Sequence, residues 1–169
     1  KLVRREGDLV PNYERRREAI KVHKPLSPED SLSHTQVANG LDISLFASEQ
    51  LGLYSVIEID WDERGRAWVI ETRDYPNEIK PAEEGQDRIR ILEDTDGDGR
   101  ADKAITFADK LSIPTGMCFA RGGIIVSMAP DFVFLKDTNG DDKADLREIL
   151  FTGWSTGDTH AGPSNLKYG

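Results

Sequence analysis

Two acidic loops of nearly the same sequence lie 43 residues apart in this chain. The first spans residues 94–102 with the sequence DTDGDGRAD, and the second spans residues 137–145 with the sequence DTNGDDKAD. Six of the nine positions are identical. Carboxylates crowded into a glycine-containing loop predict a metal site, and a repeat at a fixed distance predicts that one structural unit occurs twice.

Both loops place oxygen atoms at positions 1, 3, 5, 7 and 9, which suits calcium because this ion takes roughly six to eight oxygen ligands. Magnesium fits less well, since it keeps several waters and demands a stricter geometry. At position 6 Gly99 permits a sharp turn, whereas Asp142 stands there in the second loop at some conformational cost. The expected ligands are Asp94, Asp96, Asp98, the Arg100 carbonyl and Asp102 in the first loop, and Asp137, Asn139, Asp141, the Lys143 carbonyl and Asp145 in the second.

The alternative is a pair of turns without metal, because Asp, Asn and Gly are ordinary turn formers. The crowded carboxylates favour the metal, since they repel one another when no counter-ion is present. Glu148 stands at position 12 of the second loop, as in a helix-flanked calcium loop. The flanking residues 88–92 and 131–135 are nevertheless short, apolar and β-prone, so we expect both loops to join strands.

A repeat of about 40–45 residues built from short strands is typical of a four-stranded propeller blade. Val69 and Val126, on matched strands, are 57 residues apart, so the first unit carries an insertion, which we place at 74–86. A third unit is expected to begin at 163–169. The predicted strands are 56–62, 66–71, 88–92 and 104–108 in the first unit, and 114–119, 124–127, 131–135 and 149–151 in the second.

We therefore expect an all-β chain: a β-propeller fragment of about two blades plus the start of a third, after a short irregular and helical N-terminal extension. The expected division is residues 1–40 for the extension and 41–169 for the incomplete propeller. Residues 13–24 are basic and predict a solvated helix or linker. A short helix is expected to begin at Ser27-Pro28, and Asp42–Ala47 is the first predicted strand.

The composition narrows the range of functions. A hydrophobic fraction of 37% beside 31% charged residues indicates a globular chain. The net charge of −9 argues against nucleic-acid binding, and no apolar run reaches membrane-spanning length. Cys118 is expected to be a buried small hydrophobe. Trp61, Trp68 and Trp154 are expected in the blade cores.

An ordered series of segments resembles the planctomycete membrane-bound dehydrogenase family, propeller proteins related to sorbosone and soluble glucose dehydrogenases. The resemblance covers roughly residues 25–169. It is carried by residues 26–32, 46–49, 61–69 and 73–77, by the two acidic loops with the residues before them, and by residues 152–169.

The resemblance implies a six-bladed propeller, which needs roughly 260 residues at about 43 per blade. It further implies an exported, periplasmic or extracellular quinoprotein-like sugar or alcohol dehydrogenase with pyrroloquinoline quinone as cofactor and cytochrome c as electron acceptor. His160 is then the expected catalytic base, oriented by Asp158. Glu71 and Arg73 are expected to face the central channel and bind cofactor or substrate. The remainder of the propeller is the expected partner.

Other interpretations stay open beside the resemblance. The complete protein could be a non-catalytic, calcium-stabilised propeller that binds carbohydrate or a protein partner. His160 could be a loop histidine with a structural hydrogen bond. Glu71 and Arg73 could form an ion pair that holds the first blade.

Overall fold

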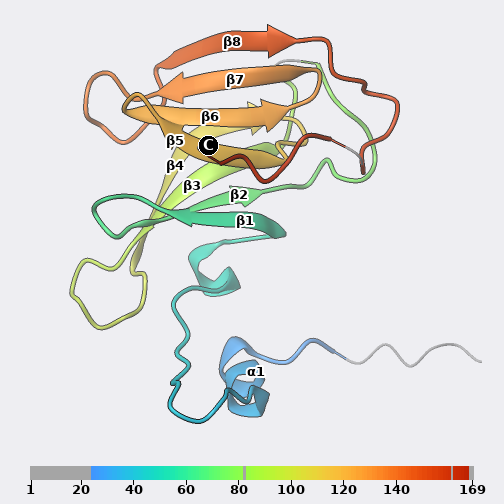
Figure 1. Ribbon diagram of the computed structural model, residues 1–169. Helices are drawn as coiled ribbons and strands as arrows, with labels where there is room; N and C mark the ends of the chain where they lie inside the picture. The colour runs from blue at the N-terminus through green and yellow to red at the C-terminus, as the bar shows by residue number, and fades with distance from the viewer. Residues whose placement is uncertain (1–23, 82, 161, 168–169) are drawn as a thin grey trace, which may run out of the picture. The chain divides into compact units, whose positions relative to one another are not determined.

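The computed structural model describes residues 24–81, 83–160 and 162–167 (Figure 1). The chain divides into two compact units, one up to Gln36 and one from Val37 onward. Most of the basic stretch predicted as a solvated helix or linker, residues 13–23, lies outside the described residues, as do the last two residues of the expected third unit.

In the described part of the first unit, residues 24–36, helix α1 spans Pro28–His34, which confirms the predicted start. Ser27 is the N-cap, and its hydroxyl accepts a hydrogen bond from the Asp30 N–H at 3.0 Å. Proline fits the first position because the first N–H groups of a helix have no partner within it. No residue of α1 is buried, so local capping rather than packing defines this helix.

The second unit consists mainly of two four-stranded antiparallel sheets, each a meander with strands in sequence order. The all-β expectation is confirmed at this level. Residues 72–86 form the long connection between the second and third strands, as the repeat spacing predicted. Sheet 1 contains β1 (Val56–Trp61), β2 (Ala67–Glu71), β3 (Asp87–Glu93) and β4 (Lys103–Leu111); sheet 2 contains β5 (Gly116–Ala120), β6 (Gly123–Met128), β7 (Asp131–Lys136) and β8 (Leu146–Thr152).

One face of each sheet, here called the inner face, packs against the other sheet. Side chains of a strand alternate between faces, so residues two apart share one face. The inner face of sheet 1 carries Trp68, Ile70, Ile89 and Ile91, and that of sheet 2 carries Met117, Ile124, Val126, Val133 and Leu135. Burial of a large aliphatic side chain contributes about 1.5–3 kcal/mol, so this cluster is the main hydrophobic contribution to the unit.

The opposite, outer faces differ in how they are covered. On the outer face of sheet 1, Val69 and Leu92 are buried beneath residues 46–53. The outer face of sheet 2 carries Cys118, Ile125, Phe132 and Phe134 by strand alternation. It borders an open groove of about 500 Å³.

The two sheets stack in the same sense. Ile91 and Phe134 hold the same place before their loops, yet Ile91 lies on an inner face and Phe134 on an outer face. Leu92 and Leu135 show the reverse arrangement. The inner face of sheet 1 is therefore equivalent to the outer face of sheet 2. Both sheets point in the same direction, as in a linear stack of repeated units.

Antiparallel meanders place alternate connections at opposite ends of a sheet. The β3–β4 and β7–β8 loops are the two acidic loops, and they share one end with the β1–β2 turn (Figure 1). We call this the acidic-loop end. The β2–β3 connection, the β4–β5 connection and the segment after β8 lie at the opposite end.

The predicted strand at Asp42–Ala47 is wrong for this structure, since no strand is assigned there. A strand needs a neighbour for its N–H and C=O groups, and no strand among the described residues pairs with this segment. Phe46 and Ala47 instead contribute apolar side chains to the cover over sheet 1.

The burial predictions for aromatic residues hold for one of three tryptophans. Trp68 is 6% exposed and confirmed as core, whereas Trp61 is 52% and Trp154 50% exposed. Trp61 points to the outer side of sheet 1, and Trp154 follows β8, so neither lies between the sheets. Cys118 is only partly buried, because it lies on the outer face of sheet 2.

Candidate functional site

The first acidic loop is closed by its own carboxylates. Asp94 accepts hydrogen bonds from the N–H groups of Gly97 at 2.7 Å and Gly99 at 2.9 Å. Asp102 accepts from both the N–H and the hydroxyl of Thr95, at 3.2 and 2.6 Å. The loop therefore has a defined conformation that its short polar side chains specify.

The second loop repeats this pattern. Asp137 accepts from the N–H groups of Gly140 at 2.7 Å and Asp142 at 2.8 Å. Asp145 accepts from the N–H and hydroxyl of Thr138 at 2.9 and 2.8 Å. Two sequences that differ at three of nine positions thus share these four hydrogen bonds. The flanking elements are strands in both loops, as predicted, and Glu148 lies within β8.

In the first loop, positions 3 and 5 keep their oxygens close to position 1. In the first loop, ligand oxygens of Asp94, Asp96 and Asp98 all lie within 4.8 Å of one another. In the second loop the amide of Asn139 replaces one carboxylate. Hard carboxylate and amide oxygens held this close fit the donor set that calcium prefers.

The two carboxylates at position 1 are held in the ionised form. The Gly99 N–H is the main group that lowers the pKa of Asp94. The Gly140 N–H has the same effect on the pKa of Asp137. A hydrogen bond to a carboxylate favours its charged form, which is the form that binds a cation.

Position 6 of the second loop contacts the β1–β2 turn of sheet 1. Asp142 adopts φ +62°, in the left-handed region where the first loop has glycine. Its Oδ1 accepts from Arg66 Nη1 at 2.8 Å, while Arg66 Nε donates to Asp62 at 2.8 Å. The Arg66 side chain is 8% exposed. Burial raises the pKa of Asp62, but hydrogen bonds from Trp68 and Arg66 outweigh it and lower the pKa overall.

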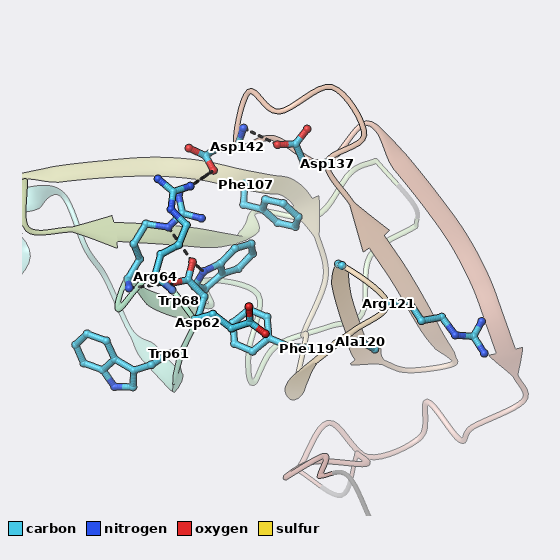
Figure 2. A pocket seen from close by; sticks show the side chains of 14 residues that line it. Trp61, Asp62, Arg64, Trp68, Phe107, Phe119, Ala120, Arg121, Asp137 and Asp142 are labelled. Carbon is cyan, nitrogen blue, oxygen red and sulfur yellow. Dashed lines mark hydrogen bonds and ion pairs between the residues drawn. The ribbon is translucent and has the colours of Figure 1, made fainter.

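A groove of about 500 Å³ opens where this loop meets sheet 1 (Figure 2). Its wall combines aromatic rings with charged groups. Trp68 packs edge-on against Phe107 and Phe119, with ring centroids 4.5 and 5.3 Å apart. At this groove Arg66 donates to both Asp62 and Asp142, and Trp68 Nε1 donates to Asp62, so these charged side chains are paired within the protein.

A second polar cluster lies at the opposite end and contains the predicted catalytic pair. His160 Nδ1 lies 3.1 Å from Asp158 Oδ1, which also accepts the His160 N–H at 2.8 Å. This N–H is the main cause of the lowered pKa of Asp158. The His160 ring packs edge-on to Tyr75 at 5.4 Å, and both side chains of the pair are exposed. The acidic loops and His160 are thus separated by the length of the strands.

Glu71 and Arg73 do not form the ion pair considered above. Glu71 is fully buried, and its two oxygens accept hydrogen bonds from the Tyr54 N–H, at 2.9 Å, and from Arg88 Nε. Arg73 is exposed, and its guanidinium stacks over the Tyr54 ring at 4.0 Å. Of the two residues expected to face a ligand, only Arg73 has a side chain that can reach one.

Asp87 was not singled out from the sequence, although it organises the His160 end. It is fully buried and accepts hydrogen bonds from the Thr72 hydroxyl at 2.9 Å and the Ile113 N–H at 2.6 Å. The N–H groups of Arg73 and Asp74 also bond to it. The available signal was an acidic residue at the start of a strand whose Ile89 and Ile91 are core residues, since a buried charge requires several partners.

Comparison with known proteins identifies a family for this chain. A family model described as a domain of unknown function, DUF7133, matches residues 27–169. No curated protein and no solved structure matches the chain. Within the part of the chain that the structure describes, no helix is long and apolar enough to cross a membrane.

Proposed function

The chain belongs to the DUF7133 family of domains of unknown function, and we propose that it supplies two blades of a calcium-stabilised β-propeller. One observation carries this proposal: two separate loops hold an aspartate at position 1 through the same pair of hydrogen bonds, at the same place in two successive sheets. A turn that needed no ion would not require the three carboxylates that converge in the first loop.

The stacking of the sheets supports the propeller. Each sheet is a four-stranded antiparallel meander, and both present the same face to the next unit. Propellers are built by this kind of repetition around an axis. A stack of two leaves one face without a following sheet, which agrees with the 70% exposure of Phe151 beside the outer face of sheet 2.

The calcium proposal is tested by thermal unfolding with and without the ion. Addition of millimolar calcium to chelator-treated protein should raise the melting temperature by several degrees, because a ligand that binds only the folded state stabilises it. Magnesium at the same concentration should raise it less. An unchanged melting temperature with both ions would refute the proposal.

Dehydrogenase chemistry is a second proposal, and the His160–Asp158 pair favours it. Asp158 bonds Nδ1 of the imidazole, which leaves Nε2 to take a proton from a sugar or alcohol hydroxyl at the exposed surface. Pyrroloquinoline quinone, when bound, would supply the hydride acceptor. Arg73 fits a role in holding its negative charge, whereas buried Glu71 does not fit. Cytochrome c as final acceptor and an exported location belong to this proposal.

The rival is a propeller without catalysis that binds carbohydrate or a protein and uses calcium for stability alone. Titration of the complete protein with pyrroloquinoline quinone, followed by dye-linked oxidation of a sugar panel, separates the two. Binding and turnover that His160→Ala abolishes would support the dehydrogenase. Absence of binding and of turnover with every sugar would remove it and leave the calcium proposal intact.

A further inference from the structure

The segment before sheet 1 has the position of an outermost strand. Ala101 and Ala144 are both the eighth residue of their acidic loops. The Ala144 N–H donates to the carbonyl of Phe107, in β4, at 2.7 Å. The Ala101 N–H donates to the carbonyl of Phe46 at 2.8 Å. Phe107 lies in the outermost strand of sheet 1 and bonds to the acidic loop of sheet 2. Phe46 makes the equivalent bond to the acidic loop of sheet 1.

The neighbouring side chains repeat the correspondence. Ala47 follows Phe46 as Ala108 follows Phe107. Phe46 and Ala47 pack on the outer face of sheet 1, and Phe107 and Ala108 belong to the cluster against the inner face of sheet 2. Since the sheets stack in the same sense, these are equivalent faces.

The correspondence with β4 is incomplete in two respects. β4 pairs with β3, whereas residues 42–47 pair with no strand among those the structure describes. Trp61 holds the place of Phe119 by the strand register. Phe119 is covered by the Trp68 ring of the preceding sheet, whereas Trp61 contacts Phe46 at 5.1 Å and stays 52% exposed.

We propose that residues 43–47 are the outer, fourth strand of a further sheet whose other three strands come from elsewhere. These three strands form an antiparallel unit of the same repeat. Its third strand lacks a partner, and its apolar inner face covers Trp61. The segment would close the propeller by joining its N-terminal strand to the last blade. An intact second copy does not fit, because its β8 would fall where Phe46 and Ala47 already lie.

This inference rests on the proposed propeller, and the test separates the two. The full chain is extended after Gly169 by a linker of about 30 Gly and Ser residues, which spans roughly 30 Å, and then by a second copy of residues 54–94. That copy carries β1–β3 and lacks β4. In the matched control the appended copy covers residues 54–111 and brings its own β4.

Hydrogen–deuterium exchange of the peptide that covers residues 41–48 is the measurement. Exchange should slow at least tenfold in the first fusion and stay unchanged in the control, because only the first fusion lacks a fourth strand. Protection of the appended strands without protection of residues 41–48 would overturn the closing strand and leave the stacking proposal standing. Protection of neither would overturn both. Equal protection in both fusions would also contradict the closing strand.

Discussion

Asp142 and Arg66 join the second acidic loop to sheet 1, with Oδ1 and Nη1 2.8 Å apart. The first loop has Gly99 at this position and makes no such bond. Asp142, which replaces the glycine of the first loop, therefore serves to bind Arg66. Position 6 need not contribute a metal ligand.

Replacement of Arg66 by methionine should destabilise the chain by about 2 kcal/mol, because hydrogen bonds to charged groups are lost and two carboxylates are left without this partner. Urea unfolding measures the change. The matched control is Arg64→Met, whose guanidinium is largely exposed and lies 3.8–3.9 Å from its acidic partners. This control should change stability by less than about 0.5 kcal/mol. Equal losses in both variants would contradict the assignment.

Acid should weaken the loops in a defined direction. The pKa values of Asp94 and Asp137 are lowered in the folded chain. Their contribution is thus fully present above the ordinary Asp pKa of about 3.9 and is lost as the pH falls through the lower folded values. In the presence of chelator, the urea concentration at the midpoint of unfolding should decrease once the pH is lowered below about 4. The fall should be smaller in Asp94→Asn/Asp137→Asn, and an identical fall in that variant would show that other groups cause it.

The inner and outer positions should respond differently to truncation. Ile89 is fully buried between the sheets, so Ile89→Ala should cost about 3 kcal/mol through lost burial and a cavity. Phe151 is larger but 70% exposed, so Phe151→Ala should cost less than about 0.5 kcal/mol. Urea unfolding of both variants tests which face is covered in solution. A larger loss of stability in Phe151→Ala than in Ile89→Ala would mean that the outer face of sheet 2 is buried in solution.

The His160 end should be independent of the acidic loops. His160→Ala should leave both the melting temperature and its calcium response unchanged, since the His160 side chain is 66% exposed and lies at the end opposite the loops. The matched variant Asp94→Asn should reduce the calcium response. Differential scanning calorimetry with calcium and with chelator compares them. A loss of calcium response in His160→Ala would show that the two ends are coupled.

Much of the fold was predictable because it depends on local pattern. Alternation and turn residues located all eight strands found in the described residues, and the spacing of Val69 and Val126 located the insertion. Asp42–Ala47 has the composition of a strand. A strand also requires a neighbouring strand for its N–H and C=O groups, and the local sequence does not show whether one is present. Trp61 is exposed for a related reason, since residues 46–53 cover only part of the outer face of sheet 1 and no sheet among the described residues packs there.

The candidate sites were predictable to different degrees. The acidic loops carry their chemistry within nine residues, so their conformation follows from sequence. Glu71 was expected to face a ligand because it ends a strand, but its environment is set by Arg88 and Tyr54, which are distant in sequence. The same holds for Asp87 and Asp142, whose partners lie in other elements.

Calcium titration by isothermal calorimetry tests the central claim most directly. The chain should bind two calcium ions, Asp94→Asn and Asp137→Asn should each bind one, and the double variant should bind none. Circular dichroism should confirm that all four proteins remain folded. Two ions bound by the folded double variant, or no heat of binding from the unmodified chain at millimolar calcium, would contradict calcium binding by these loops.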